Sequence, residues 1–292
     1  MNGPLFSVII PTYERRDLLV TAVNSVLRQT VDDLECIVVD DASPSGVDLG
    51  LADSRLRVTR HPANRGATCA RNTGLSLARG RYVTFLDDDD VWTPQRLEYA
   101  LQGLARAPIS ICYRGSFDEK PSRNRTLNGD VRHEILNDLT PNLGQTACLR
   151  SLVLFLDERF AACEDVDWWL RMSGVGPVST VPQVGLLYRE HDGPRNLNGA
   201  PARLSGSHLL LDLHRAYFAD HRRAHAFRWK RIGLLAQKVD DRKQARRAFL
   251  KSAVLWPDVR PLVHFGRTIR ESAASSRLFR PTETRECLRT QI

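Results

Sequence analysis

The chain has 292 residues, of which 42% are hydrophobic and 26% are charged. This length and apolar content indicate a globular protein with one large domain or about one and a half ordinary ones. The chain holds no apolar run near the roughly 20 residues that cross a bilayer, and no secretion signal at its N-terminus. We therefore expect neither a membrane-spanning nor a secreted protein, but a cytoplasmic one.

The cysteines and the charge distribution narrow the class further. The six cysteines contain no C-x-x-C pair, which argues against a zinc ribbon and a disulfide framework and favours a reducing compartment. The net charge of +8 is uneven, because residues 201–292 hold 20 Lys and Arg against 8 Asp and Glu. This basic end suggests an anionic partner, such as a lipid surface, an anionic glycan or a nucleic acid, although solvated helix faces would give a similar count.

The N-terminal third alternates between buried strands and amphipathic helices. Strands are predicted at Leu5–Pro11, Leu34–Asp40, Leu56–Arg60 and Tyr82–Leu86, and helices at Arg15–Gln29 and Gly66–Ala78. This alternation predicts a parallel, doubly wound α/β sheet. Ligands of such sheets bind beyond the carboxyl ends of the strands. Three of these ends carry polar clusters, which are residues 12–14, 40–41 and 87–90.

The middle of the chain adds further strands, and the C-terminal part is helical. A helix is predicted at Pro94–Arg106 and another at Glu164–Met172, with strands at Ile109–Tyr113, Gln145–Leu149, Val178–Val181 and Val184–Arg189. The polar stretch 115–142 is either a loop or lid over the site or a disordered insertion. Helices alone follow, at Leu204–Asp220, Ala224–Lys238 and Arg242–Leu255. We expect an α/β domain at 1–202 and a basic helical extension at 203–292.

Four consecutive carboxylates, Asp87 to Asp90, follow the strand predicted at Tyr82–Leu86. Unit charges about 4 Å apart interact by roughly 4 kcal/mol at an effective dielectric of about 20, so the cluster needs water or a cation nearby. A hard divalent metal that carries a phosphate-bearing ligand meets this need. A solvated acidic turn meets it as well.

Several short segments occur in a fixed order: SVIIPTYE at 7–14, VDDAS at 39–43, NRG at 64–66, ARNTG at 70–74, FLDDDDVW at 85–92 and ED at 164–165. Together they resemble the family 2 glycosyltransferases of the GT-A fold, over residues 5 to about 195. The resemblance implies a GT-A type, Rossmann-like, mostly parallel doubly wound sheet. It also implies inverting, metal-dependent transfer of a sugar from a nucleoside-diphosphate sugar, of the UDP or dTDP type, to a hydroxyl of a glycan or lipid-linked acceptor. Cell-surface polysaccharide or glycoconjugate synthesis is the expected role.

The same resemblance assigns residues to the nucleotide. It implies that the base is held by Pro11, Tyr13, Glu14 and Asp41. An aspartate can accept the imide N–H of uracil or thymine, but Asp41 can also be a plain turn residue. Asp40 is expected to be structural and to cap the turn through Ser43. Asp88 is the expected ribose contact.

The metal and the diphosphate are assigned in the same way. The D-x-D element aligns with Asp87 to Asp89, so Asp87 and Asp89 are the expected ligands of Mn or Mg, which would neutralise the leaving diphosphate. The register stays open, because Asp88 with Asp90 has the same spacing. The region of Arg71 and Asn72 is expected to brace the donor site, and Asn64 is a further expected donor-binding residue. Arg71 can pair with Asp87 or Asp89, touch the diphosphate, or be a surface arginine.

By the same match, Asp165 is the catalytic base that takes the proton of the acceptor hydroxyl. Glu164 is expected to be structural, because carboxylates are favourable at a helix N-terminus. Trp168 or Trp169 can stack on a sugar ring, although one of them is expected in the core. His191 is a predicted metal ligand or phosphate donor, with an exposed loop histidine as the alternative.

Two other classes stay open. A sugar-phosphate nucleotidyltransferase also uses an α/β nucleotide site, but the chain lacks the glycine-rich, lysine-bearing segment expected after the first strand. A catalytically inactive glycan-binding module is the other, and Asp165 and Asp89 argue against it. The basic extension is expected to contact the inner face of an anionic membrane, where lipid-linked acceptors lie, and no nucleic acid partner is expected.

Overall fold

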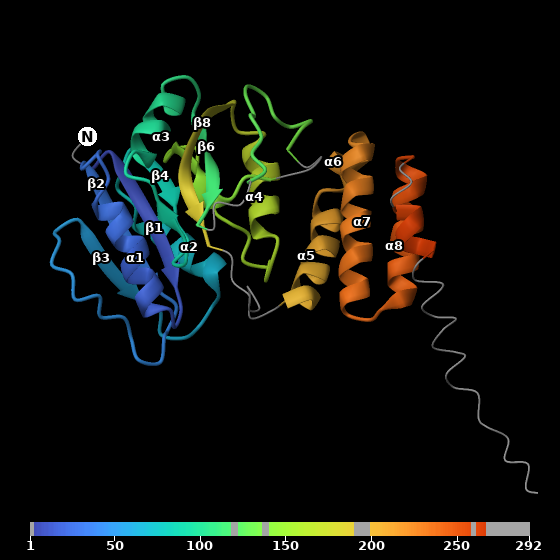
Figure 1. Cartoon of the computed structure of the whole chain (residues 1–292), viewed down its shortest axis with the longest axis horizontal. Helices are drawn as coiled ribbons and strands as arrows, with labels where there is room; N and C mark the ends of the chain where they lie inside the picture. Colours follow the sequence, from blue (N-terminus) through green and yellow to red (C-terminus); the bar gives the residue numbers. More distant parts are fainter. Residues whose placement is uncertain (1–2, 118–121, 136–139, 190–198, 258–260, 267–292) are drawn as a thin grey trace, which may run out of the picture. The chain divides into compact units, whose positions relative to one another are not determined.

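The computed structural model describes residues 3–117, 122–135, 140–189, 199–257 and 261–266. Contacts divide the chain into two compact units, Met1–Tyr217 and Phe218–Ile292. The first unit is built on an eight-stranded sheet with strand order β3-β2-β1-β4-β7-β6-β8-β5 (Figure 1). Its strands are β1 Phe6–Thr12, β2 Leu34–Asp40, β3 Leu56–Arg60, β4 Tyr82–Phe85, β5 Val91–Trp92, β6 Ile109–Ser116, β7 Thr146–Leu149 and β8 Val178–Tyr188.

The sheet is mostly parallel, as the sequence predicts. The strands β3, β2, β1 and β4 run parallel to one another, and β6 runs parallel to β8. The strand β7 is antiparallel to both of its neighbours, and β5 is antiparallel to β8. The helices of this unit are α1 Arg16–Leu27, α2 Ala67–Leu77, α3 Arg96–Leu104, α4 Glu164–Met172 and α5 Gly199–Leu213, and a 3-10 turn covers Leu143–Gln145.

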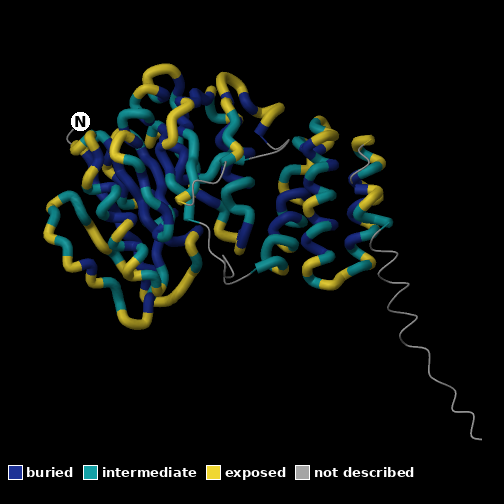
Figure 2. The backbone as a smooth tube through the Cα atoms, viewed as in Figure 1, coloured by how far each residue is buried: buried dark blue, intermediate teal, exposed yellow. Residues whose placement is uncertain are grey.

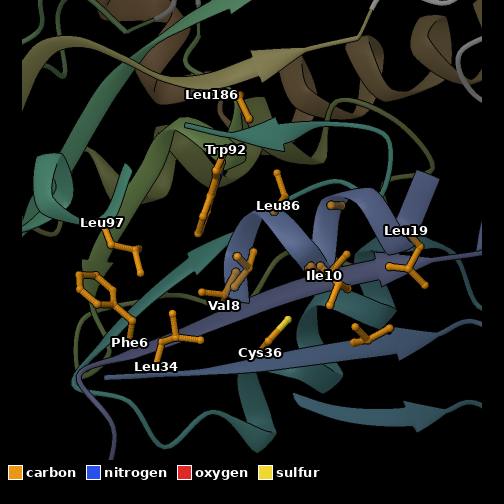
Figure 3. Close-up of a cluster of buried hydrophobic side chains, with 14 of the residues drawn as sticks. Phe6, Val8, Ile10, Leu19, Leu34, Cys36, Leu86, Trp92, Leu97 and Leu186 are labelled. Atoms are coloured by element: carbon orange, nitrogen blue, oxygen red, sulfur yellow. The ribbon is translucent and has the colours of Figure 1, made fainter. Parts of the chain in front are cut away.

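Helices cover both faces of the sheet, which explains why every residue of β1 and β2 is buried (Figure 2). Because side chains alternate along a strand, Phe6, Val8 and Ile10 share one face of β1 and join a cluster with Leu19 of α1 and Leu97 of α3 (Figure 3). On the opposite face, a Cβ at Gly74 would lie 2.3 Å from Ile9 Cγ2. The glycine therefore allows α2 to pack directly on β1.

Three predicted elements differ from the observed ones. The two strands expected at 178–189 form one strand, β8, whose pairing with β6 shifts register near Tyr113, where Pro182 and Gln183 are exposed. The helix expected at Leu204–Asp220 is two helices, α5 and α6 (Arg215–Asp220). The strand β5 was not predicted, because two residues carry no readable periodicity.

Within the polar stretch 115–142, residues 115 and 116 belong to β6, whereas 117, 122–135 and 140–142 form no helix or strand, with one isolated bridge between Gly129 and Val178. Residues 118–121 and 136–139 lie outside the described residues. The loop prediction therefore fits the described part after Ser116.

The second unit contains α7 (Arg222–Lys238) and α8 (Arg242–Leu255), which pack against each other. Asp241 caps α8 by accepting the N–H of Gln244 at 2.8 Å. Between these two helices, a Cβ at Gly233 would lie 2.5 Å from Phe249 Cε1. Among the helices that the structure describes, none has both the length and the apolar character to span a bilayer. The predicted domain boundary at residue 203 stays a prediction.

Candidate active site

The carboxyl ends of β1, β2 and β4 meet at one edge of the sheet. The backbone N–H of Asp41, just after β2, donates to the Thr12 carbonyl of β1 at 2.9 Å. The Thr12 hydroxyl donates to Asp88 Oδ2, in the turn after β4, at 2.8 Å. The polar clusters that the sequence predicts at three strand ends therefore lie side by side.

Three of the four consecutive carboxylates converge. Asp87, Asp89 and Asp90 each offer an oxygen within 4.8 Å of the others. Asp88 instead bonds to Thr12 and accepts from Arg15 Nη1 at 3.1 Å. Three carboxylates form a hard oxygen donor set, which fits Mn or Mg. Asp90 is therefore also a candidate ligand. The sequence left open whether Asp90, together with Asp88, forms the D-x-D element.

The buried members of this run resist ionisation. Burial raises the pKa of Asp88 to about 6, although the hydrogen bond from Thr12 and the charge of Arg15 oppose the shift. Burial, followed by the charge of Asp87, raises the pKa of Asp90 to about 8. A bound cation would offset this unfavourable charge, which is a second reason that the residues suit a metal.

Two basic residues that the sequence did not single out hold the acidic run. Arg15 Nη1 bridges Asp88 Oδ1 and Asp89 Oδ2, the latter at 2.7 Å. Arg189 donates its backbone N–H to Asp90 Oδ1 at 3.0 Å and its Nε to the Asp89 carbonyl at 3.2 Å. The sequence could have identified Arg15 as a candidate site residue, because it directly follows the segment 11–14, which is predicted to bind the base. The sequence placed the basic role of the 188–191 segment on His191, which lies outside the described residues.

Arg71 joins the acidic run to the start of α4. Its buried guanidinium donates through Nη2 to Asp87 Oδ1 at 2.6 Å and through Nη1 to Glu164 Oε1 at 3.1 Å. Burial alone would lower the pKa of Arg71, but the charges of Asp87, Glu164 and Asp165 raise it overall. The predicted pairing with Asp87 is confirmed. The bridge also puts Asp165, the predicted base, close to the cluster.

The loop before α4 is fixed by α2. The side chain of Asn72 donates to the Leu156 carbonyl and accepts the Leu156 N–H, both at 2.9 Å. Cys163, the residue before α4, is left-handed with φ 73°, and Asp165 accepts the N–H of Val166 at 2.8 Å. The helix start therefore has a set position beside Arg71.

The third acidic residue of α4 and the two tryptophans of this helix are structural. Asp167 is buried and bonds to Arg171, at 2.6 Å, and to His214 Nε2, at 2.7 Å. Trp168 and Trp169 are fully buried, and their indole N–H groups donate to the carbonyls of Leu154 and Pro141. The idea that one of them stacks on a sugar ring is therefore wrong, because neither ring is accessible.

The acidic pair Asp40 and Asp41, at the end of β2, is buried and hydrogen bonded. Asp40 accepts from the N–H and hydroxyl of Ser43, at 2.9 and 2.5 Å, which confirms its predicted capping role. Asp41 accepts the N–H of Gly66 at 2.6 Å, at the start of α2, and lies 2.7 Å from His61 Nδ1. His61 was not predicted; its position just after a strand was the available signal. A base contact by Asp41 stays a prediction.

The remaining predicted residues surround these strand ends. Pro11 is buried, Tyr13 is half-buried, and Glu14 and Asn64 are exposed. The N–H of Glu14 donates to Ser43 Oγ at 3.0 Å, and Glu14 has a φ of 57°. Their contacts with a nucleotide stay predictions.

A mostly parallel α/β sheet with carboxylates beyond its strand ends is typical of nucleotide-binding enzymes. The family model described as "Glycosyl transferase family 2" matches residues 7–157. The putative colanic acid biosynthesis glycosyl transferase WcaA of Escherichia coli K12 is 43% identical over 233 residues, which are 74% of this chain and 84% of that protein. This chain belongs to glycosyl transferase family 2, as its motifs predict.

The chain is also similar to two further proteins. The Escherichia coli enzyme WfgD, named a UDP-Glc:alpha-D-GlcNAc-diphosphoundecaprenol beta-1,3-glucosyltransferase, is 35% identical over 116 residues, 39% of this chain and 46% of that protein. The structure of S. aureus TarS 1-349 in complex with UDP-GlcNAc aligns with a TM-score of 0.65 at 18% identity, over 94% of this chain and 93% of that one. The latter likeness confirms the GT-A type fold.

Proposed function

We propose that this glycosyltransferase is an inverting, metal-dependent enzyme that moves a sugar from a UDP- or dTDP-type donor to an acceptor hydroxyl. The observation that carries the proposal is the Arg71 bridge, since one buried side chain joins the candidate metal cluster at Asp87 to Glu164, the neighbour of Asp165. A donor diphosphate at the cluster and a base at Asp165 would then face one reacting carbon.

The reaction follows from these positions. Asp165 takes the proton of the acceptor hydroxyl while its oxygen attacks the anomeric carbon from the side opposite the diphosphate. The bond from that carbon to the diphosphate oxygen breaks, and the nucleoside diphosphate leaves with the electron pair. The attack inverts the configuration.

The donor is expected to span the strand ends. Tyr13, Glu14 and Asp41 are proposed to hold the base, with Pro11 and Asn64 beside them, and Asp88 the ribose. Asp87, Asp89 and Asp90 would hold Mn or Mg, whose charge stabilises the leaving diphosphate. Arg189, whose backbone and side chain both reach this run, takes the basic role that the sequence gave to His191.

The relatives support a role in polysaccharide synthesis. The name of WcaA refers to colanic acid biosynthesis, that of WfgD to a UDP-Glc donor and a diphosphoundecaprenol-linked acceptor, and TarS was solved with UDP-GlcNAc. We therefore expect a UDP-sugar donor and a glycan or lipid-linked acceptor.

Asp165→Asn tests the mechanism. Transfer, measured as release of nucleoside diphosphate in the presence of acceptor, should fall to background, whereas the donor in the presence of Mn should still raise the melting temperature. A donor at 100-fold its Kd stabilises by about 2.7 kcal/mol, which is readily measured. The matched control is Asp212→Asn, on the exposed part of α5. Full transfer by Asp165→Asn would exclude Asp165 as the base.

The second unit is proposed to contact an anionic membrane. Lys243, Arg247, Leu250, Lys251 and Val254 are exposed and share one face of α8 by their spacing. Val254 is 78% exposed, and Trp256, just after the helix, is 45% exposed. Cations beside exposed apolar side chains suit a lipid surface.

A further inference from the structure

The first unit contains a basic cavity, which contrasts with the acidic run. Its interior measures about 20 Å³, it is partly open to solvent, and it is lined by Ile111, Arg114, Arg123, Asn124, Arg125, Thr140, Pro141 and Gln145. Three of these residues are arginines, and none of the described lining residues is acidic. This space admits a group about the size of a water molecule or a phosphate oxygen, and the rest of a ligand would lie at the open mouth of the cavity.

The arginines are brought together by one side-chain pairing. Asn124 accepts the backbone N–H of Arg114 at 2.9 Å and donates to the Arg114 carbonyl at 2.8 Å. This pairing fixes the irregular segment 122–135 to β6 and places Arg123 and Arg125, the neighbours of Asn124, next to Arg114. The pairing of Asn124 with Arg114 therefore holds the arginines of the basic cavity together.

The guanidinium groups keep capacity for a ligand. Arg125 uses Nη1 and Nη2 for the Glu134 carbonyl and carboxylate, at 3.1 and 3.3 Å, and Arg114 uses Nη1 for Asn142 Oδ1 at 3.3 Å. Arg123 is exposed. A guanidinium has five N–H donors, so each of these groups has donors left over. Several such forks around one cavity match the geometry of phosphate oxygens.

The cavity is linked to both halves of the candidate active site. The Pro141 carbonyl, which lines it, accepts the indole N–H of Trp169 in α4, at 2.9 Å. On the other side, the Arg114 guanidinium lies 5.6 Å from the centroid of the Tyr188 ring, and the next residue, Arg189, donates its backbone N–H to Asp90. The cavity is thus connected both to the candidate metal cluster and to the helix that carries the proposed base.

We propose that this cavity binds the phosphate groups of a diphosphate-linked acceptor. The inference rests on the proposed function, because only an acceptor needs a second anion site apart from the donor diphosphate. Phosphate is favoured over a sugar carboxylate because a diphosphate has enough oxygens to engage several guanidinium forks at once.

Calorimetric titration with inorganic pyrophosphate in EDTA tests this site. Without a divalent cation, the four carboxylates of the acidic run repel pyrophosphate, so the arginine cavity is the expected site. Arg123→Gln and Arg125→Gln should each weaken binding on the order of tenfold, the effect of one charged hydrogen bond. The matched control is Arg132→Gln, because Arg132 pairs with Asp130 in the same segment and does not line the cavity. It should bind as the native chain does.

Three results would overturn the proposal: no binding of pyrophosphate, equal binding by all the variants, or tighter binding of glucuronate than of pyrophosphate. Arg123→Gln keeps the test valid if Arg125→Gln disturbs the loop, because Arg123 is exposed. Donor binding with Mn is measured on the same samples. Its absence would overturn the proposed function, whereas a loss of pyrophosphate binding alone concerns only this cavity.

Discussion

Arg15 occupies oxygens that a metal would need. Its Nη1 lies 2.7 Å from Asp89 Oδ2, so a cation that binds Asp89 competes with this guanidinium. Arg15→Gln should therefore bind Mn severalfold more tightly in the absence of nucleotide, as measured by calorimetry. The matched control is the neighbouring Arg16→Gln, because Arg16 donates to the Asp48 carbonyl instead. Weaker or unchanged Mn binding by Arg15→Gln would contradict this competition.

Glu35 gives the fold a pH dependence at acidic pH. Burial opposes its ionisation, but hydrogen bonds from the Ser7 hydroxyl and from Arg79 outweigh burial and lower the pKa of Glu35 below its ordinary 4.5. A lowered folded pKa means that its stabilisation is present above about pH 4.5 and is lost as the pH falls through the folded value. Glu35→Gln should unfold about 1–3 kcal/mol more easily at pH 7.

The check is urea unfolding at several pH values. The difference in unfolding free energy between the native chain and Glu35→Gln should shrink below pH 4.5. Glu98→Gln, at a half-buried position of α3, serves as the control. A constant difference from pH 7 to pH 3 would exclude the ionised Glu35 as its source.

The sequence located the site but not the direction of each side chain. The run Asp87 to Asp90 was readable because it follows a strand, yet the turn decides that Asp88 bonds to Thr12 while Asp90 joins the cluster. Arg15 and His61 were not predicted as site residues, because their hydrogen-bond partners, Asp88 and Asp41, are distant in sequence. The burial of both tryptophans depends on the loops around α4 and left no signal in their spacing.

Among the elements, α5 supports the start of α4. A Cβ at Gly206 would lie 2.1 Å from the Ala162 carbonyl oxygen, next to the left-handed Cys163. Gly206→Ala must push α5 away or move this backbone, at a cost of about 1–3 kcal/mol. We expect a lower melting temperature and slower transfer, because Asp165 is two residues from Cys163.

The control is Gly174→Ala, just after α4, where an added Cβ would meet only the Arg171 carbonyl oxygen at 3.4 Å. It should retain both stability and transfer. Native stability and rate in Gly206→Ala would show that the tight contact has no bearing on Asp165, the proposed base.

The regular elements could be predicted because local pattern and tertiary packing agree. Both buried strands β1 and β2, and the helices α4 and α8, lie within one residue of their predicted bounds. The sequence did not predict that β8 is one irregular strand or that the chain breaks between α5 and α6. Both features depend on pairing and packing with distant segments. The antiparallel direction of β7 likewise follows from the whole sheet.

At the scale of the whole molecule, the basic second unit should make membrane binding depend on salt. The full chain is expected to sediment with anionic vesicles and not with neutral ones, and less so at high ionic strength. Lys243→Gln with Arg247→Gln should lower binding roughly 30-fold, at about 1 kcal/mol for each charge. No salt-sensitive sedimentation would exclude the membrane contact.

The double control is Arg57→Gln with Arg106→Gln, at two exposed positions of the first unit. It removes the same net charge and should bind vesicles as the native chain does. An equal loss in both double variants would indicate attraction by net charge and not by the α8 face.

Arg71 also sets the distance between two carboxylates of the candidate active site. Because one planar guanidinium holds Asp87 with one nitrogen and Glu164 with another, the separation between these two carboxylates is fixed by the width of that group. A lysine could reach either carboxylate but would not keep the two a set distance apart. A change at position 71 would therefore alter the distance between Asp87 of the acidic run and Glu164 at the start of α4, even if every other side chain stayed in place.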